Sequence, residues 1–111
     1  MPSKKYMKGY RFEREVKEKL EKDGWYVIRS AGSKKPDLIA AKDKKVVVIE
    51  CKVTKTPQLY LQKEEVEVLK AVASNFNADA MYAVKYKRKV HFFFIENLRE
   101  KNSSFLLNLE E

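Results

Sequence analysis

Apolar residues recur at helical spacing in two parts of the chain. The stripe of the first part consists of Phe12, Val16 and Leu20. Gly24 follows this stripe as a signal for a helix C-terminus, so the pattern predicts a helix over residues 9–23. A second helix is predicted over residues 62–76. Its stripe consists of Val66, Leu69, Ala73 and Phe76, with Val68 and Val72 beside it.

Shorter apolar runs between and after these segments predict strands. They cover residues 25–30, 37–42, 45–53, 80–86 and 90–96. The run 46–49 is apolar on both faces, which is typical of a central strand in a covered sheet. Residues 54–61 are expected to form a connection, and 97–111 show no clear period beyond a strand-like segment at 105–107. The order predicts an α/β fold in which helices flank a central mixed sheet.

Length and composition narrow the class of protein. With 111 residues, 44% of them hydrophobic, and only three Gly and three Pro, the chain suits one domain with a real core. No apolar run approaches the roughly 20 residues of a membrane helix, and no signal-peptide pattern follows the basic start. We therefore expect an intracellular protein without a membrane partner. A single cysteine and a single histidine argue against zinc sites and histidine triads.

The positive charge is distributed unevenly. Residues 1–60 carry 16 Lys/Arg and 8 Asp/Glu, whereas residues 61–111 carry 8 of each, so the first half holds the whole net charge of +8. This excess indicates a polyanionic partner. Nucleic acid is expected rather than an anionic membrane surface, because neither predicted helix combines a basic face with a strongly apolar face that is free of core packing. We expect the half that carries this charge to meet the partner and the other half to serve as a scaffold. The candidates for phosphate contact are Lys4, Lys5 and Lys8, in an expected flexible arm over residues 1–8, and the loop residues Lys34 and Lys35.

Charged residues interrupt two of the apolar strand patterns. Asp37 follows Pro36 at the start of one strand, and Glu50 and Lys52 lie in the next. Alternation along a strand places Glu50 and Lys52 on one face and Cys51 on the other. A hairpin would bring Asp37 close to the first of these faces. Because an unpaired buried charge costs several kcal/mol, these charges require partners or a function.

Carboxylates that converge at the end of a sheet are typical of a magnesium site. Asp37 and Glu50 would supply oxygen ligands, and the backbone carbonyl of Cys51 is a third candidate. The metal would polarise a phosphoryl oxygen, and Lys52 would orient the attacking water or stabilise charge on the phosphate. Glu13, at the rim of the first helix's stripe, is a further candidate. The expected reaction is hydrolysis of a phosphodiester rather than conversion of a small-molecule substrate.

These residues also have a structural interpretation. Glu-x-Lys pairs in strands are usually solvent-facing charges, and Pro-Asp is an ordinary turn signal. On their own, the residues leave the structural and the nuclease interpretations equally open.

Four blocks of residues, in a specific order, carry a family resemblance. They are Gly9…Phe12-Glu13-Arg14-Glu15, Gly24-Trp25…Arg29-Ser30-Ala31-Gly32-Ser33, Pro36-Asp37-Leu38, and Ile49-Glu50-Cys51-Lys52 with Thr54-Lys55. Over residues 8–95 the chain resembles the archaeal Holliday junction resolvases of the Hjc type, within the nuclease superfamily named for its PD…(D/E)xK motif. The resemblance implies a restriction-endonuclease-like fold in a single nuclease domain over residues 1–111.

The resemblance also implies an activity and the residues that carry it. A symmetric homodimer would bind four-way DNA junctions and cut two strands with Mg²⁺, or with Mn²⁺ in its place, in DNA recombination and repair. The residues implied at the catalytic centre are Glu13, Asp37, Glu50, Lys52 and Ser33. The residues implied in DNA contact, beside the arm and loop lysines, are Arg14, Arg29 and Lys55.

Three questions stay open at this point. Val68, Val72 and Phe76 widen the second helix's apolar face, which indicates core packing or a two-fold dimer interface. The same catalytic site would also suit a restriction-like or repair endonuclease that acts on duplex DNA. A non-catalytic basic DNA-binding module is the third alternative, although such a module gains nothing from acidic residues on its basic face.

Overall fold

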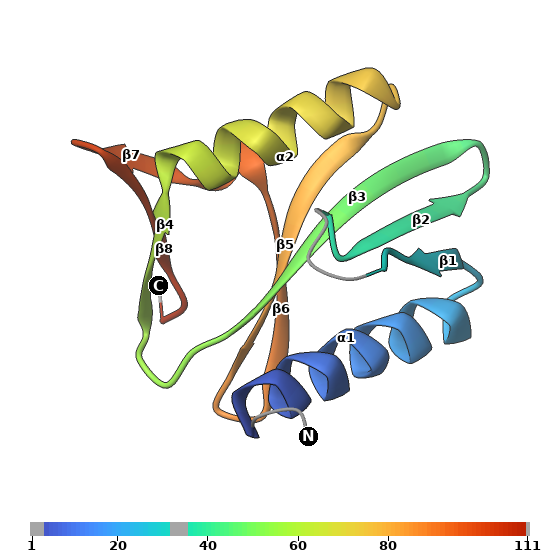
Figure 1. The fold of residues 1–111 in the computed structure, drawn as a ribbon, viewed down its shortest axis with the longest axis horizontal. Coiled ribbons are helices and arrows are strands. Elements are labelled where there is room, and N and C mark those ends of the chain that lie inside the picture. The colour runs from blue at the N-terminus through green and yellow to red at the C-terminus, as the bar shows by residue number, and fades with distance from the viewer. Residues whose placement is uncertain (1–3, 32–35, 111) are drawn as a thin grey trace.

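Two sheets and two helices make up the part of the chain that the computed structural model describes, which is residues 4–31 and 36–110, with side chains from Tyr10 onward in the first helix (Figure 1). In chain order the elements are α1 (Lys4–Lys22), β1 (Tyr26–Arg29), β2 (Leu38–Lys42), β3 (Lys45–Val53), β4 (Gln58–Gln62), α2 (Lys63–Asn75), β5 (Asp79–Tyr86), β6 (Lys89–Phe94), the 3₁₀ helix η1 (Ile95–Asn97), β7 (Arg99–Lys101) and β8 (Ser104–Asn108).

The larger sheet has the strand order β1-β2-β3-β5-β6. Its β3–β5 pair is parallel, with Glu50 opposite Tyr82, and its other pairs are antiparallel. The expected central mixed sheet flanked by helices is therefore confirmed. The strand that bears Glu50 lies at the centre of this sheet, as its apolar run predicted.

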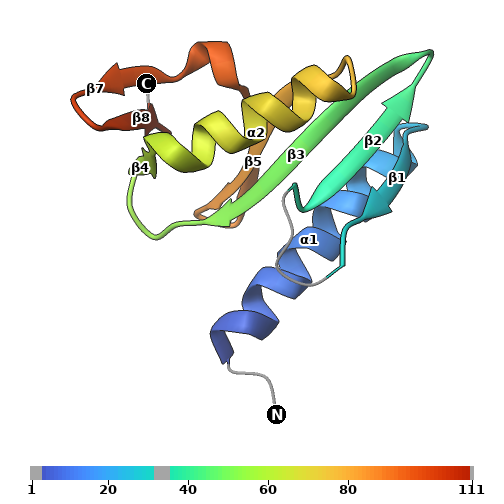
Figure 2. The ribbon, with the colours of Figure 1, turned by 45° about the horizontal axis from the view of Figure 1, so that its top comes forward.

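The helices cover opposite faces of the larger sheet (Figure 1). Side chains alternate along β3, so Val47 and Ile49 pack in the α1 cluster with Phe12, while Val48 packs in the α2 cluster with Leu69. Figure 2 shows that α2 lies across β3 and β5, whereas β1 and β2 extend beyond it. Residues 47–50 of β3 are buried, so polar groups of this strand can reach water only near its two ends.

Both helices end in the same hydrogen-bonded motif. At the end of α1, the N–H of Trp25 donates to Leu20 and that of Gly24 donates to Glu21, with Gly24 at φ 91°. At the end of α2, Asn77 at φ 52° takes the place of the glycine. These bonds satisfy carbonyls that a helix end otherwise leaves without partners. The stop signals expected after each helix are therefore present in the structure.

The first helix begins earlier than its apolar pattern predicts. Residues 4–8, expected as a flexible arm, form the first turns of α1. Extending an existing helix by one residue costs far less than starting a new helix, so a short polar segment without proline can continue it. The apolar stripe indicates only where the helix is buried.

The C-terminal part of the chain contains an unexpected second sheet. β4 lies where a connection was expected, and it pairs with β8, which in turn pairs with β7. Leu61, Phe105 and Leu107 of this sheet are buried in the cluster beneath α2. The paired residues of β4 and β8 are more than forty positions apart in sequence, so no local pattern reveals this pairing.

Phe76 does not belong to the buried stripe of α2. Val66, Leu69 and Ala73 are buried as predicted, but Phe76 is the C-cap residue and is 56% exposed. The chain turns away at Asn77, so the side chain leaves the helix face that packs on the sheet. No helix in the described part of the chain is both long and apolar enough to cross a membrane.

We expect Gly24→Ala to lower the free energy of unfolding by about 1 kcal/mol, because a Cβ is unfavourable at φ 91°. Space is not the cause, since an added Cβ would approach only the Lys42 side chain, at 3.6 Å. Urea denaturation measures the change. The matched control is Asn77→Gly, which keeps a left-handed cap and should change stability by less than about 0.5 kcal/mol. A similar loss in both variants would contradict this account.

Candidate active site

Two carboxylates are linked to each other through the backbone where β2 begins. The N–H of Asp37 donates to Oε1 of Glu50 over 3.2 Å, and the N–H of Cys51 donates to Oδ2 of Asp37 over 2.8 Å. Each carboxylate therefore accepts a backbone hydrogen bond from the strand that bears the other. The structure brings together the two acidic residues that the sequence singled out as metal ligands.

The strand pairing explains this contact. The β2–β3 ladder ends at the pair Leu38–Ile49, so at Cys51 this edge of β3 faces the Asp37 carboxylate instead of a strand. In a hydrogen-bonded pair of an antiparallel ladder, each residue bonds its partner through both its N–H and its C=O. The N–H and C=O of one residue therefore point to the same side of the strand. The carbonyl of Cys51 therefore also points toward Asp37.

Glu50 is a buried carboxylate at the end of an apolar strand segment. It is 1% exposed, and it is the single charged residue in the buried class among the described side chains. Burying a carboxylate is costly unless hydrogen bonds or opposite charge compensate it. The backbone N–H of Asp37 supplies part of that compensation. A divalent cation bound between the two carboxylates would supply more.

Lys52 lies on the α2 side of the sheet, two residues beyond Glu50. Its Nζ is 2.6 Å from Oε1 of Glu65, and the two side chains are 29% and 20% exposed. Glu65 belongs to the first turn of α2. No sequence pattern singles out Glu65, because acidic residues in a first helical turn are common and Glu64 precedes it directly.

Glu13 lies on the α1 side of the sheet. Its Oε1 is 3.5 Å from Nε of Arg29, whose guanidinium lies 4.3 Å from the centre of the Tyr10 ring. Burial chiefly, and then the charges of Asp37 and Glu13, raise the pKa of the Cys51 thiol. The thiol therefore stays protonated and packs against the α1 cluster, and only the backbone carbonyl of Cys51 suits metal binding.

The atoms available as metal ligands at this site determine which cation it suits. Asp37, Glu50 and the Cys51 carbonyl offer oxygen alone, which suits a hard cation such as Mg²⁺. Within residues 4–31 and 36–110, no three acidic, histidine or cysteine side chains form a metal-binding group. Glu13 is therefore not gathered with Asp37 and Glu50 into a three-carboxylate cluster, and it faces Arg29 instead.

Ser30 is a second residue that sequence reasoning did not single out for the site. Its hydroxyl donates to the carbonyl of Pro36, and its backbone N–H donates to the carbonyl of Asp37 over 3.0 Å. These bonds join the end of β1 to the segment that presents Asp37. Only the position of Ser30 after a short strand could have indicated this role, and that signal is weak.

The remaining predicted residues occupy different surroundings. Arg14 is exposed and pairs with Glu18 over 3.2 Å, and Lys55 is exposed after β3. On α2, Val68 is 49% exposed, whereas Val72 packs in part against the core. Several predicted residues lie outside the described residues or side chains, namely Ser33, Lys34 and Lys35, and the side chains of Lys4, Lys5 and Lys8.

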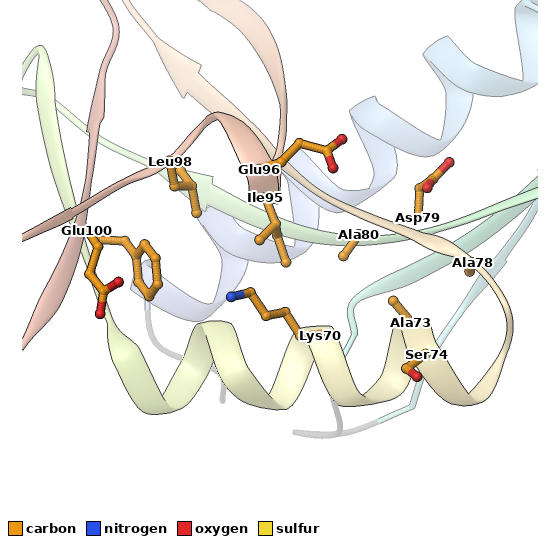
Figure 3. A pocket seen from close by; sticks show the side chains of 11 residues that line it. Lys70, Ala73, Ser74, Ala78, Asp79, Ala80, Ile95, Glu96, Leu98 and Glu100 are labelled. Carbon is orange, nitrogen blue, oxygen red and sulfur yellow. The ribbon is translucent and has the colours of Figure 1, made fainter.

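A hollow of about 510 Å³ lies elsewhere, between α2, η1 and the start of β5 (Figure 3). Lys70 extends into it from α2. Its rim carries Asp79, Glu96 and Glu100, which would repel phosphate. Asp79 stands opposite Val47, at the end of the β3–β5 pair away from Lys52. This hollow is therefore separate from the carboxylate pair and does not suit a DNA backbone.

Comparisons with known proteins identify relatives of this chain. The family model described as archaeal Holliday junction resolvase (Hjc) matches residues 4–110. The crossover junction endodeoxyribonuclease Hjc of Methanocaldococcus jannaschii is 41% identical over 88% of this chain and 75% of its own length. The protein of the same name from Archaeoglobus fulgidus is 37% identical over 91% of this chain and 79% of its own.

The fold comparison gives the same result. The solved structure of Archaeoglobus fulgidus Hjc, a Holliday junction resolvase from an archaeal hyperthermophile, superposes with a TM-score of 0.86 at 37% identity, covering 91% of this chain and 84% of that one. The match leaves less than a tenth of this chain uncovered. The chain belongs to the archaeal Holliday junction resolvase (Hjc) family.

Proposed function

We propose that this protein is a metal-dependent endonuclease that cuts four-way DNA junctions in recombination and repair, with Asp37, Glu50 and Lys52 at its catalytic centre. The observation that carries the proposal is the linked Asp37–Glu50 pair, with Lys52 on the same strand two residues beyond Glu50. Membership of the Hjc family and the names of the relatives support the substrate. Such a substrate places the protein with the DNA, in the cytoplasm or nucleoid.

Asp37, Glu50 and the Cys51 carbonyl would hold Mg²⁺, or Mn²⁺ in its place. The bound metal would supply Lewis-acid stabilisation of a phosphoryl oxygen and a water of lowered pKa. The backbone N–H groups of Asp37 and Cys51 fix the two carboxylates, so neither has to be reoriented when the substrate arrives. Lys52 would place its ammonium beside the phosphate and stabilise the negative charge that develops there.

Other residues would support the catalytic centre or bind DNA. Arg29 lies on the α1 side of the site beside Glu13, and Glu13 would act by fixing this guanidinium or by completing the metal site. Ser33 would contribute from its loop to the catalytic centre. The residues proposed to contact phosphates are Lys4, Lys5, Lys8, Arg14, Arg29, Lys34, Lys35 and Lys55.

A homodimer is part of the proposal, because a two-fold enzyme suits a two-fold junction. The apolar residues that α2 leaves open to solvent are Val68 and Phe76. Val72 lies on the same helix but packs in part on the core. We propose that Val68 and Phe76, with the exposed part of Val72, belong to the dimer interface.

Replacing Asp37 by Asn should slow junction cleavage by at least about 100-fold, because a neutral amide is a poor ligand for Mg²⁺. The amide oxygen can still accept the Cys51 N–H, so fold and junction affinity should persist. Cleavage and gel-shift assays with Mg²⁺ and with EDTA measure both quantities, and EDTA should stop the wild-type reaction. The control is Asp43→Asn in the β2–β3 turn, where φ is 51° and Asn fits. Full cleavage by Asp37→Asn would overturn the metal assignment.

The substrate is tested with one preparation on a four-way junction and on its component duplex. We expect cleavage of the junction only, and two protein copies for each junction in gel filtration. Equal cleavage of both DNAs would instead favour a duplex-specific repair or restriction-like enzyme. Binding without cleavage of either would favour the non-catalytic binding module.

Replacing Phe76 by Asp should shift the free protein toward monomer mass in gel filtration, because a charge would be buried in the interface. The control is Tyr26→Asp on β1, which replaces another aromatic and more exposed side chain away from α2. It should leave the dimer intact. If Phe76→Asp stays dimeric, the interface does not include this end of α2.

A further inference from the structure

Lys52 has a close acidic neighbour that belongs to another element of the fold. Its Nζ is 2.6 Å from Oε1 of Glu65, and both side chains are less than one-third exposed. An ion pair in this position is only partly screened by water, unlike one between two fully exposed side chains. The contact crosses from β3 to α2, so it links the central strand to the second helix.

Glu65 is held by a rigid part of the molecule. It occupies the first turn of α2, between Gln62, the N-cap residue whose side chain makes no capping bond, and the buried Val66. A negative charge in a first helical turn is stabilised by the helix dipole. Val66 and Leu69 pack in the core cluster beneath α2 and hold this end of the helix against it. The carboxylate therefore has a fixed position relative to β3.

Tyr82 is a neighbour of both Glu65 and the carboxylate pair. Tyr82 is fully buried and stands opposite Glu50 in the parallel β3–β5 register. Burial chiefly, and then the neighbouring charge of Glu65, raise the pKa of its hydroxyl. The buried phenol therefore stays protonated and carries no charge beside Glu65. Glu65, Tyr82 and Glu50 lie on the same side of the sheet as Lys52.

We propose that Glu65 is a positioning residue that holds the Lys52 ammonium at the catalytic centre. This inference rests on the proposed function, in which Lys52 stabilises charge on the phosphate. A lysine side chain has a flexible four-carbon stem, and a fixed opposite charge at its end favours few of its many rotamers. The ammonium is then already in place at the catalytic centre when the DNA arrives. Precise orientation at the reacting group contributes strongly to the rate.

Glu65→Gln is the direct test. Under single-turnover conditions with enzyme in excess, the cleavage rate of a four-way junction should fall about 10- to 100-fold, because the lysine loses its fixed partner. The dissociation constant for the junction should stay within about two-fold. The shorter Glu65→Asp keeps the charge and should recover part of the rate. The matched control Glu64→Gln removes an exposed carboxylate of the same turn and should cleave at the wild-type rate.

A double-mutant cycle with Lys52→Ala separates positioning from a structural effect. If Glu65 acts through Lys52, Glu65→Gln should cause no further loss of rate in the Lys52→Ala background. An equal loss in both backgrounds would overturn the inference, and so would a faster rate in Glu65→Gln, which would mean that Glu65 restrains the lysine. If Glu65→Gln does not fold, Glu65→Asp carries the cycle. If Lys52→Ala alone leaves the rate unchanged, the proposed function fails, and not only this inference.

Discussion

The exchange of backbone hydrogen bonds between Asp37 and the Glu50–Cys51 segment is the interaction on which the site depends. Glu50 is buried at the end of the apolar segment of β3, so its charge is tolerable only where nearby groups compensate for lost water. The β2–β3 ladder stops at Leu38, and Asp37 takes the place of the next strand residue. The ladder's end therefore determines both where a carboxylate can be buried and where a cation would be favoured.

The two helices then decide which charges can approach this pair. Because α1 and α2 cover opposite faces of the sheet, each contributes polar groups on its own side. Glu13 and Arg29 meet on the α1 side, and Lys52 and Glu65 meet on the α2 side. On the α1 side, the thiol of Cys51 is a small uncharged group that packs against the α1 cluster. A phosphate that approaches the strand end would thus meet cations from both faces.

Alternation and spacing were enough to predict the central mixed sheet, the apolar middle of β3 and the convergence of Asp37 with Glu50, because these features depend on neighbours along the chain. The pairing of β4 with β8 depends on distant partners, and no local pattern contains it. The same limit applies to Glu65. Its sequence context is that of any acidic first turn, and only the packing of α2 on the sheet places it, and not Glu64, against Lys52.

The uneven charge acquires a different meaning once these contacts are known. The first sixty residues hold the whole positive excess, which suggested a cutting half and a scaffolding half. Yet the second half supplies Glu65 to Lys52, and it supplies Lys85, whose Nζ is 2.5 Å from Oε1 of Glu15 on α1. Balanced charge in the second half therefore does not mean that it is inert. Its carboxylates and lysines fix charged groups of the first half in place, while the net positive charge of the first half would still attract the DNA backbone.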